Sequence, residues 1–367
     1  MRLGVLDIGS NTVHLLLVEA YPGARPVAFA SHKRPLSLVR FLDESGAINP
    51  RGRRELLTFV SEAVAFAGRH KVDDLLAFCT SALRGATNGA AVINEVEATT
   101  GIVLEELSGE QEAAMTYFAA RRWFGWDTRD LTVLDIGGGS FEMATGRDEF
   151  PAAAVSVPLG AARLTKDRLP GNPPAPSSVA ALREYVKDTL AEPVKVLKRQ
   201  PSPDLVAATS KTFRSLARVA GAAPSGAGPY VPRLLRLSDL SLWSRRMEAL
   251  SFEERTALPG VSEIRAPQLL AGAIVAQAAM EALGIQELRI CPWAVREGLI
   301  LHRFDRLLRD HDVVEDAYVG VGGVELLSRD LNQVPAVSAA AAAAIAAAAQ
   351  MPDGGASAVV GRGGAFA

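Results

Sequence analysis

The sequence is poor in cysteine and nearly balanced in charge, and both properties exclude large classes of protein. Only Cys79 and Cys291 occur in 367 residues, and no C-x-x-C pair exists. A disulfide framework and a thiolate metal site are therefore excluded, and we expect a reducing compartment, the cytoplasm. With 39 Lys and Arg against 41 Asp and Glu, the net charge is −2. This balance argues against a nucleic acid as partner.

Targeting segments and long apolar runs are also missing. The N-terminus reaches Asp7 without the apolar core of a signal peptide, so export by that route is not expected. The most apolar long stretch, residues 269–283, is interrupted by Gln277 and Glu281. It is shorter than the ~20 residues that span a bilayer. We therefore predict a core helix there and no membrane partner.

Two common nucleotide-binding signatures fail in this sequence. No Gly-Lys-[Ser/Thr] of a Walker A loop is present. A Rossmann fingerprint needs a helix straight after its glycines, whereas residues 12–15 and 141–145 read as returning strands. The five histidines are scattered without metal-ligand spacing, and both cysteines have the apolar surroundings of buried thiols.

What is present is an alternation of helix and strand patterns. Apolar residues recur at helical spacing between residues 50 and 70 and are followed by a short apolar run at 75–78, which predicts layers of α/β structure. At roughly 100–200 residues per domain, we predict two lobes, 1–128 and 129–308. The remaining Ala- and Gly-rich residues, 309–367, are predicted to be a disordered tail.

One motif occurs twice. Asp-Ile-Gly-Ser-Asn-Thr at 7–12 is echoed by Asp-Ile-Gly-Gly-Gly-Ser at 135–140, which indicates a diverged duplication. Each copy ends an apolar strand with a carboxylate and continues with small residues whose backbone N–H groups can approach an anion closely. Two such loops facing each other across a cleft between the lobes would grip a phosphate.

The paired motif resembles the actin-like ATPase superfamily, and further matches narrow the resemblance to the exopolyphosphatase and guanosine pentaphosphate phosphatase (Ppx/GppA) family. The chain is most similar to the short actinobacterial exopolyphosphatases. Besides the two Asp-Ile-Gly loops, the matching segments are Thr-Ser-Ala-Leu-Arg-Gly-Ala-Thr-Asn at 80–88, Ser-Gly-Glu-Gln-Glu-Ala at 108–113, Pro-Leu-Gly-Ala-Ala-Arg-Leu at 158–164, Ala-Thr-Ser-Lys-Thr-Phe-Arg-Ser-Leu-Ala at 208–217, Arg-Ala at 265–266 with Gly272, and Ile-Cys-Pro-Trp-Ala-Val-Arg-Glu-Gly at 290–298.

This resemblance implies a two-lobed α/β protein with the actin-like, ribonuclease H-like fold and mixed sheets, working as a homodimer. It implies hydrolysis of the terminal phosphate of inorganic polyphosphate with Mg²⁺, by in-line attack of water that Glu112 activates. Because longer relatives carry additional C-terminal domains, we expect a preference for short chains.

The implied site has four groups of residues. Glu112, Arg84 and Glu142 are the expected catalytic residues, since a carboxylate can accept a proton from water and a guanidinium can clamp phosphoryl oxygens. The expected phosphate-binding residues are Asp7, Gly9, Ser10, Asn11, Thr12, Gly137, Gly138, Gly139 and Ser140. The expected metal ligands are Asp135, Glu142 and Asp7, hard oxygen donors suited to Mg²⁺. The cations expected to follow the polyphosphate chain are Arg163, Lys211, Arg214 and Arg265.

Three alternatives stay open. The same family site also hydrolyses guanosine pentaphosphate (pppGpp), so a 5′-phosphohydrolase is the nearest one. A non-catalytic sensor of alarmone or polyphosphate would keep the loops without turnover, and Glu112 argues against it. A kinase of sugar or acetate is disfavoured by Thr-Ser-Lys-Thr at 209–212, where nucleotide-binding members of the superfamily show Gly-Gly.

Overall fold

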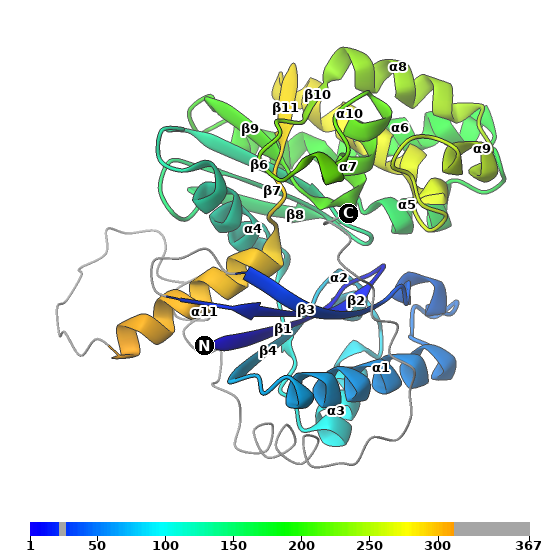
Figure 1. Cartoon of the computed structure of the whole chain (residues 1–367). Helices are drawn as coiled ribbons and strands as arrows, with labels where there is room; N and C mark the ends of the chain where they lie inside the picture. Colours follow the sequence, from blue (N-terminus) through cyan, green and yellow to red (C-terminus); the bar gives the residue numbers. More distant parts are fainter. Residues whose placement is uncertain (22–26, 312–367) are drawn as a thin grey trace. The chain divides into compact units, whose positions relative to one another are not determined.

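The computed structural model describes residues 1–21 and 27–311, which form two compact units (Figure 1). Unit 1 comprises residues 1–108 together with 299–311, and unit 2 comprises residues 109–298. The predicted α/β class is confirmed, because each unit is built on one mixed sheet with helices. From residue 312 on, the predicted disordered tail lies outside the described residues.

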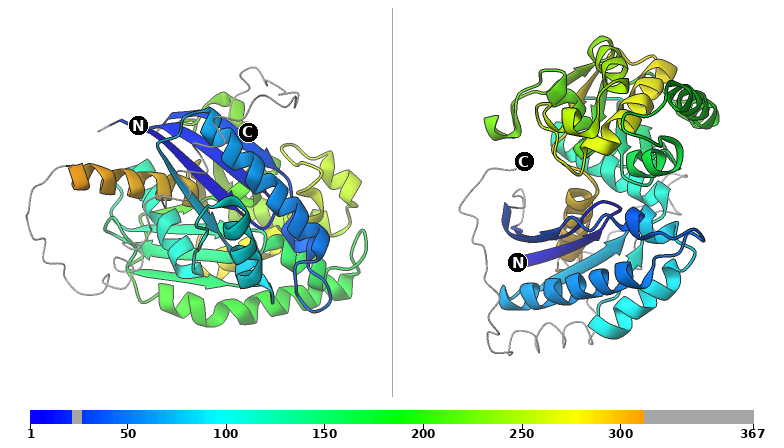
Figure 2. Two further views of the ribbon diagram at one scale, coloured as in Figure 1. Left: turned by 90° about the horizontal axis from the view of Figure 1, so that it is seen from below. Right: turned by 90° about the vertical axis from the view of Figure 1, so that its right-hand side faces the viewer.

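Unit 1 is a sheet of strand order β3-β2-β1-β4-β5 with helices α1 and α3 together on one side (Figures 1 and 2). Its elements are β1 (Arg2–Ile8), β2 (Val13–Glu19), β3 (Val27–Arg34), η1 (Leu38–Phe41), α1 (Pro50–Arg69), β4 (Asp74–Cys79), α2 (Ser81–Arg84), α3 (Gly89–Thr100), β5 (Glu105–Glu106) and the second part of α11 (Val295–His311). Strand β5 is only two residues long, because only Glu105 and Glu106 pair with the end of β4.

Unit 2 repeats this order in a larger sheet, β10-β11-β9-β6-β7-β8. The strands β8-β7-β6-β9-β11 of unit 2 have the same order and directions as β3-β2-β1-β4-β5 of unit 1, and β10 is added at the edge beside β11. The elements are α4 (Gly109–Phe124), β6 (Leu131–Ile136), β7 (Phe141–Gly146), β8 (Ala153–Val157), α5 (Ala161–Arg168), α6 (Pro176–Leu197), β9 (Leu205–Ala208), α7 (Ser210–Val219), η2 (Ser225–Ala227), β10 (Leu234–Arg236), α8 (Leu237–Glu248), α9 (Phe252–Thr256), η3 (Ala266–Gln268), α10 (Leu269–Leu283), β11 (Glu287–Ile290) and the first turn of α11. The duplication seen in one motif therefore extends over the sheets.

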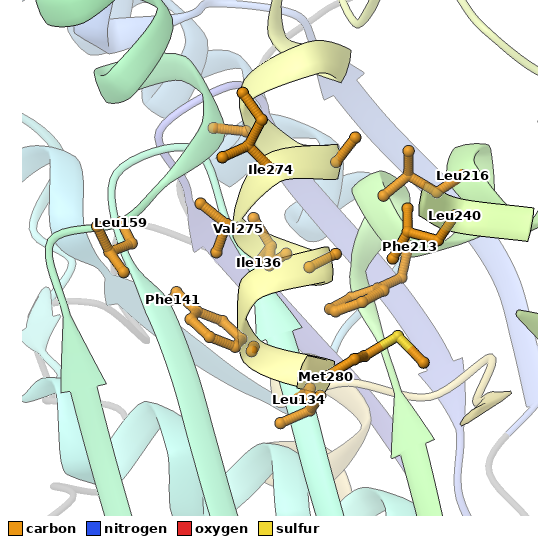
Figure 3. Close-up of a cluster of buried hydrophobic side chains, with 14 of the residues drawn as sticks. Leu134, Ile136, Phe141, Leu159, Phe213, Leu216, Leu240, Ile274, Val275 and Met280 are labelled. Atoms are coloured by element: carbon orange, nitrogen blue, oxygen red, sulfur yellow. The ribbon is translucent and has the colours of Figure 1, made fainter. Parts of the chain in front are cut away.

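The core of unit 2 lies on the face of the sheet that α10 covers. The predicted core helix is confirmed as α10, whose Ile274, Val275 and Met280 pack with strand residues that include Ile136 and Phe141 (Figure 3). A segment that includes it, Ala266–Leu283, is long and apolar enough to cross a membrane, but 67% of it is buried inside the protein. It is therefore the core helix of a globular unit.

Helix α4 covers the opposite face of the same sheet. Its Ala113, Tyr117 and Ala120 pack with Val133 and Ala144, which alternate along β6 and β7 with the residues that face α10. Helix α4 thus packs on the second sheet, and the compact units divide at 108/109, whereas the sequence analysis placed the boundary at 128/129. Helix α11 likewise joins unit 1 from residue 299, inside the lobe predicted to run to 308.

A buried ion pair ties α11 to the sheet of unit 1. Arg303 Nε lies 2.6 Å from Asp74 Oδ2, and both side chains are 8% exposed. We expect Arg303→Met to lower the free energy of unfolding of unit 1 by about 3–5 kcal/mol, because it leaves a carboxylate buried without its partner. Urea unfolding followed by circular dichroism measures this. The half-exposed pair of Arg53 with Glu95 provides the control, since Arg53→Met should cost less than about 1 kcal/mol.

Candidate active site

The loops of the two Asp-Ile-Gly motifs, residues 9–12 and 137–140, are hairpin turns, as the sequence predicts. Ile8 pairs with Val13 and Ile136 pairs with Phe141 across antiparallel strands, so residues 9–12 and 137–140 are the connecting loops. Each loop is closed by the same bond, which runs from the first N–H to the last carbonyl: 3.2 Å between Gly9 N and Thr12 O, and 2.9 Å between Gly137 N and Ser140 O. Neither loop opens a helix, which confirms the exclusion of a Rossmann fingerprint.

The loop of unit 2 presents a row of donors without acceptors. In the part of the chain that the structure describes, no acceptor is bound to the backbone N–H of Gly138, Gly139 or Ser140. Ser140 Oγ is also buried without a hydrogen-bond partner among these residues. Buried polar groups are ordinarily paired, so this loop is built to receive acceptors from outside the protein. Adjacent N–H groups of this kind form an anion-binding concavity.

Two carboxylates stand beside this loop on the face that α4 covers. Asp135 and Glu142 are directly opposite each other on β6 and β7, and their alternation with Val133 and Ala144 places both on the α4 side. Glu142 is 2% exposed and accepts a hydrogen bond from Ser156 Oγ at 2.9 Å. Cross-strand neighbours lie within about 5.5 Å at Cβ, so the two side chains are close enough to act on one ligand.

Helix α4 brings Glu112 to the same end of the sheet. Near its C-terminus, Arg121 Nη2 donates to Gly146 O at 3.3 Å, at the far end of β7. Glu112 lies nine residues back along the helix, about 14 Å, and Glu142 lies four residues back along β7, about 13 Å. Glu112 therefore reaches the level of Glu142, in the first turn of α4, where the helix dipole favours its ionised form.

Asp135 is the electrostatic centre of this cluster. Burial raises its pKa to about 6, while the Thr209 hydroxyl, which donates a hydrogen bond to Oδ2, and the charges of Arg214 and Arg265 act in the opposite direction. Burial also lowers the pKa of Arg265 to about 10, helped by the charge of Arg214, and lowers that of Arg214. Arg214 Nε is buried without a hydrogen-bond partner among the described residues. Two buried guanidinium groups beside a single carboxylate leave an excess of positive charge, which favours the binding of an anion.

The other two predicted cations lie at helix starts. Lys211 is exposed in the first turn of α7, and Arg163 is partly buried in the first turn of α5. The backbone N–H of Arg163 donates to Gly138 O at 3.0 Å, so this residue is tied to the loop.

Unit 1 holds the remaining predicted residues. Asp7 is the penultimate residue of β1 and pairs with His14. It corresponds to Asp135 of unit 2, and His14 corresponds to Glu142. Ser10 Oγ lies 3.0 Å from Ser81 Oγ, which ties the first loop to α2, the helix that ends at Arg84. Arg84 Nη1 donates to Leu107 O, which holds this guanidinium against the end of the segment that leads into α4.

Thr209 is a functional candidate that the sequence reasoning missed. It is fully buried at the end of β9 and bonds the carboxylate of Asp135, 74 residues earlier in the chain. A second repeated motif in the sequence could have identified Thr209. The dipeptide Thr-Ser follows β4 at 80–81 and β9 at 209–210.

The predicted magnesium ligands come from both units, with Asp135 and Glu142 in unit 2 and Asp7 in unit 1. No cluster of three or more His, Cys, Asp or Glu side chains within residues 1–21 and 27–311 is arranged to hold a metal ion. Mg²⁺, however, keeps several waters and commonly uses one or two carboxylates. The adjacent pair of Asp135 and Glu142, one of them destabilised as an anion by burial, fits such a hydrated ion.

Comparison with known proteins identifies the family and the fold of this chain. The model of the Ppx/GppA phosphatase family matches residues 18–307. The chain is 48% identical over 305 residues to Exopolyphosphatase 1 of Mycobacterium tuberculosis, covering 83% of this chain and 89% of the relative. Among solved structures, an exopolyphosphatase from Cytophaga hutchinsonii superposes with a TM-score of 0.75 at 22% identity, covering 83% of this chain and 98% of that one. The Aquifex aeolicus member of the Ppx/GppA family gives 0.70 at 24%, covering 84% and 98%. These two structures have the fold of this chain.

Proposed function

Because this chain belongs to the Ppx/GppA phosphatase family, a family of phosphate-releasing hydrolases with the actin-like fold, we propose that it is an exopolyphosphatase that removes the terminal phosphate of inorganic polyphosphate. The observation that carries the proposal is the loop 137–140, whose N–H groups at 138–140 and buried Ser140 hydroxyl lack acceptors among the described residues. A terminal phosphoryl group supplies several oxygens at once. It is therefore the kind of ligand that this row of donors fits.

The residues around the loop have different roles in the proposed reaction. Glu112 orients a water molecule and accepts its proton, since it lies in the first turn of a helix, whose dipole favours the carboxylate form, at the end of the sheet where the loop lies. Arg214 and Arg265 offset the negative charge of the polyphosphate chain. Phosphoryl transfer depends mainly on positioning and on neutralising the equatorial oxygens, so no covalent intermediate is required.

We assign Mg²⁺ to Asp135 and Glu142, the adjacent pair at the ends of β6 and β7. When bound, the ion neutralises charge on the phosphate oxygens. Thr209 and Ser156 donate hydrogen bonds from their hydroxyl groups to the two carboxylates, which would hold these side chains in place for the ion. Asp7 is the third proposed carboxylate.

The loop 9–12 and Arg84 of unit 1 are assigned to the same substrate. Ser10, Asn11 and Thr12 offer short polar side chains in a hairpin of the same design, and Arg84 offers a planar fork of donors for two oxygens. We also expect the enzyme to act in the cytoplasm as a homodimer.

A phosphate-release assay tests the proposal against its alternatives. The purified protein with Mg²⁺ is incubated separately with polyphosphate, with pppGpp, and with ATP plus a sugar or acetate. Release from polyphosphate is the expected result. Phosphate release from pppGpp alone would indicate a pentaphosphate 5′-phosphohydrolase instead. Transfer of a phosphoryl group from ATP to the sugar or acetate would indicate a kinase. Binding of polyphosphate without hydrolysis would indicate a sensor.

We expect a preference for short chains. The cations assigned to the substrate are few, and two of them, Arg214 and Arg265, lie near Asp135 itself, so they serve only the phosphates next to the cleavage point. Initial rates at equal concentrations of chain ends should be higher on short polyphosphate than on very long polyphosphate. A clear preference for very long chains would contradict this expectation.

A further inference from the structure

The start of helix α5 forms hydrogen bonds with the loop 137–140, called the phosphate loop below. The chain leaves β8 and turns at Gly160 into α5, and the first backbone N–H groups of this helix bond to the loop 137–140. Ala161 N donates to Gly137 O, and Ala162 N and Arg163 N donate to Gly138 O, each at 3.0 Å. The first N–H groups of a helix have no partner within it. Here the loop carbonyls supply the missing acceptors.

Gly160 allows this close approach. A Cβ atom added at Gly160 would lie 2.2 Å from Gly139 C, 2.3 Å from Ser140 N and 2.4 Å from Gly139 N. The backbone of Gly160 is extended, with φ −68° and ψ 139°, so any residue could adopt its conformation. The glycine is therefore required for space against the loop and for no other reason.

These bonds decide which way the loop N–H groups point. A trans peptide unit is planar, and its carbonyl and its N–H point in opposite directions. The carbonyls of Gly137 and Gly138 belong to the same peptide units as the N–H groups of Gly138 and Gly139. Because α5 holds both carbonyls on its side, the two N–H groups face away from the helix.

We propose that Gly160 and the first turn of α5 are a positioning device for the phosphate loop, which holds two peptide units in the orientation that binds a phosphoryl group. Gly160 is a positioning residue, since it touches the loop backbone. The nature of the ligand rests on the proposed function, whereas the orientation of the loop does not. A further support comes from α10, where Gly272 admits Thr212 and Ala161, with a Cβ there 2.4 Å from Thr212 Cγ2 and 3.6 Å from Ala161 Cβ.

Gly160→Ala tests the device, with Gly146→Ala as its matched control. The control places a Cβ 2.7 Å from Ala152 N and 3.0 Å from Pro151 Cα, a milder overlap that is also with backbone atoms, at the opposite end of β7. We expect the amides of residues 161–163 to exchange hydrogen at least about tenfold faster in Gly160→Ala, because their bonds to the loop are lost. The same amides should exchange at the wild-type rate in Gly146→Ala.

Kinetics provide the second readout. With polyphosphate as the probe, kcat of Gly160→Ala should fall by about 10²-fold, since a displacement of about 1 Å at a reacting group has that effect. Gly146→Ala should keep kcat for its folded fraction, even where its melting temperature falls. Ala161→Pro is a second variant, because proline fits the first turn of a helix but removes one donor to the loop; its kcat should fall as well.

The two readouts separate the possible failures. Unchanged exchange at residues 161–163 in Gly160→Ala would overturn the positioning role, whatever the substrate. An equal loss of kcat in Gly146→Ala would overturn it too, because the effect would then be one of general destabilisation. If the wild-type protein releases no phosphate from polyphosphate, the proposed function fails, and the exchange measurement still decides the role of Gly160.

Discussion

Replacing Glu112 by glutamine should reduce phosphate release by about 10²–10⁴-fold, the usual contribution of a general base. Glutamine keeps the size and the hydrogen-bonding oxygen of the side chain but accepts no proton from water. The affinity for polyphosphate should remain, because the loop donors and the arginines supply the binding. The expected signature is therefore a collapse of kcat with a nearly unchanged KM. Glu112→Ala should behave in the same way.

Glu110→Gln is the matched control for this experiment. Glu110 lies in the same first turn of α4, but its side chain is exposed. Both substitutions remove one negative charge from the helix N-terminus and so lose the same interaction with the helix dipole. Steady-state rates on polyphosphate should be near the wild-type level in Glu110→Gln. Comparable losses in the two variants would show that the charge of the helix terminus matters and that Glu112 is not the base.

The sequence predicted best those features whose determinants are close together in the chain. The two hairpins were predictable because an apolar strand, a loop of small residues and a returning strand lie in one short continuous segment, 2–19 in one case and 131–146 in the other. Asp135 and Glu142 follow from the same local pattern, since the register of a hairpin decides which residues face each other.

Features that depend on residues far apart could not be predicted in this way. The bond of Thr209 to Asp135 joins residues 74 positions apart, and the glycine at 160 matters only because the loop at 137–140 lies against it. The assignment of α4 to the first lobe differs from the compact units for a similar reason. An amphipathic helix reveals that it has an apolar face, but not which of two sheets that face covers.

Asp135→Asn should give the second large loss, about 10²-fold or more in the rate measured with Mg²⁺. The substitution keeps the shape of the side chain and removes the charge that we assign to the metal. It also leaves Arg214 and Arg265 without the carboxylate that partly neutralises them. We therefore expect two opposite effects: a higher Mg²⁺ concentration for the half-maximal rate, and an equal or tighter binding of inorganic phosphate in the absence of metal.

Thr209→Val separates the charge of Asp135 from its orientation. Valine matches threonine in shape and removes only the hydroxyl group that bonds Asp135. Losing a residue that hydrogen-bonds a metal ligand costs about 10–100-fold in metal affinity or activity. The Mg²⁺ concentration for the half-maximal rate of Thr209→Val should therefore rise, as in Asp135→Asn, but by a smaller factor. Titration of phosphate release with Mg²⁺ measures both shifts. If Asp135→Asn loses activity while its Mg²⁺ requirement equals that of the wild type, the role of the carboxylate is to neutralise Arg214 and Arg265, and the ion binds to other residues.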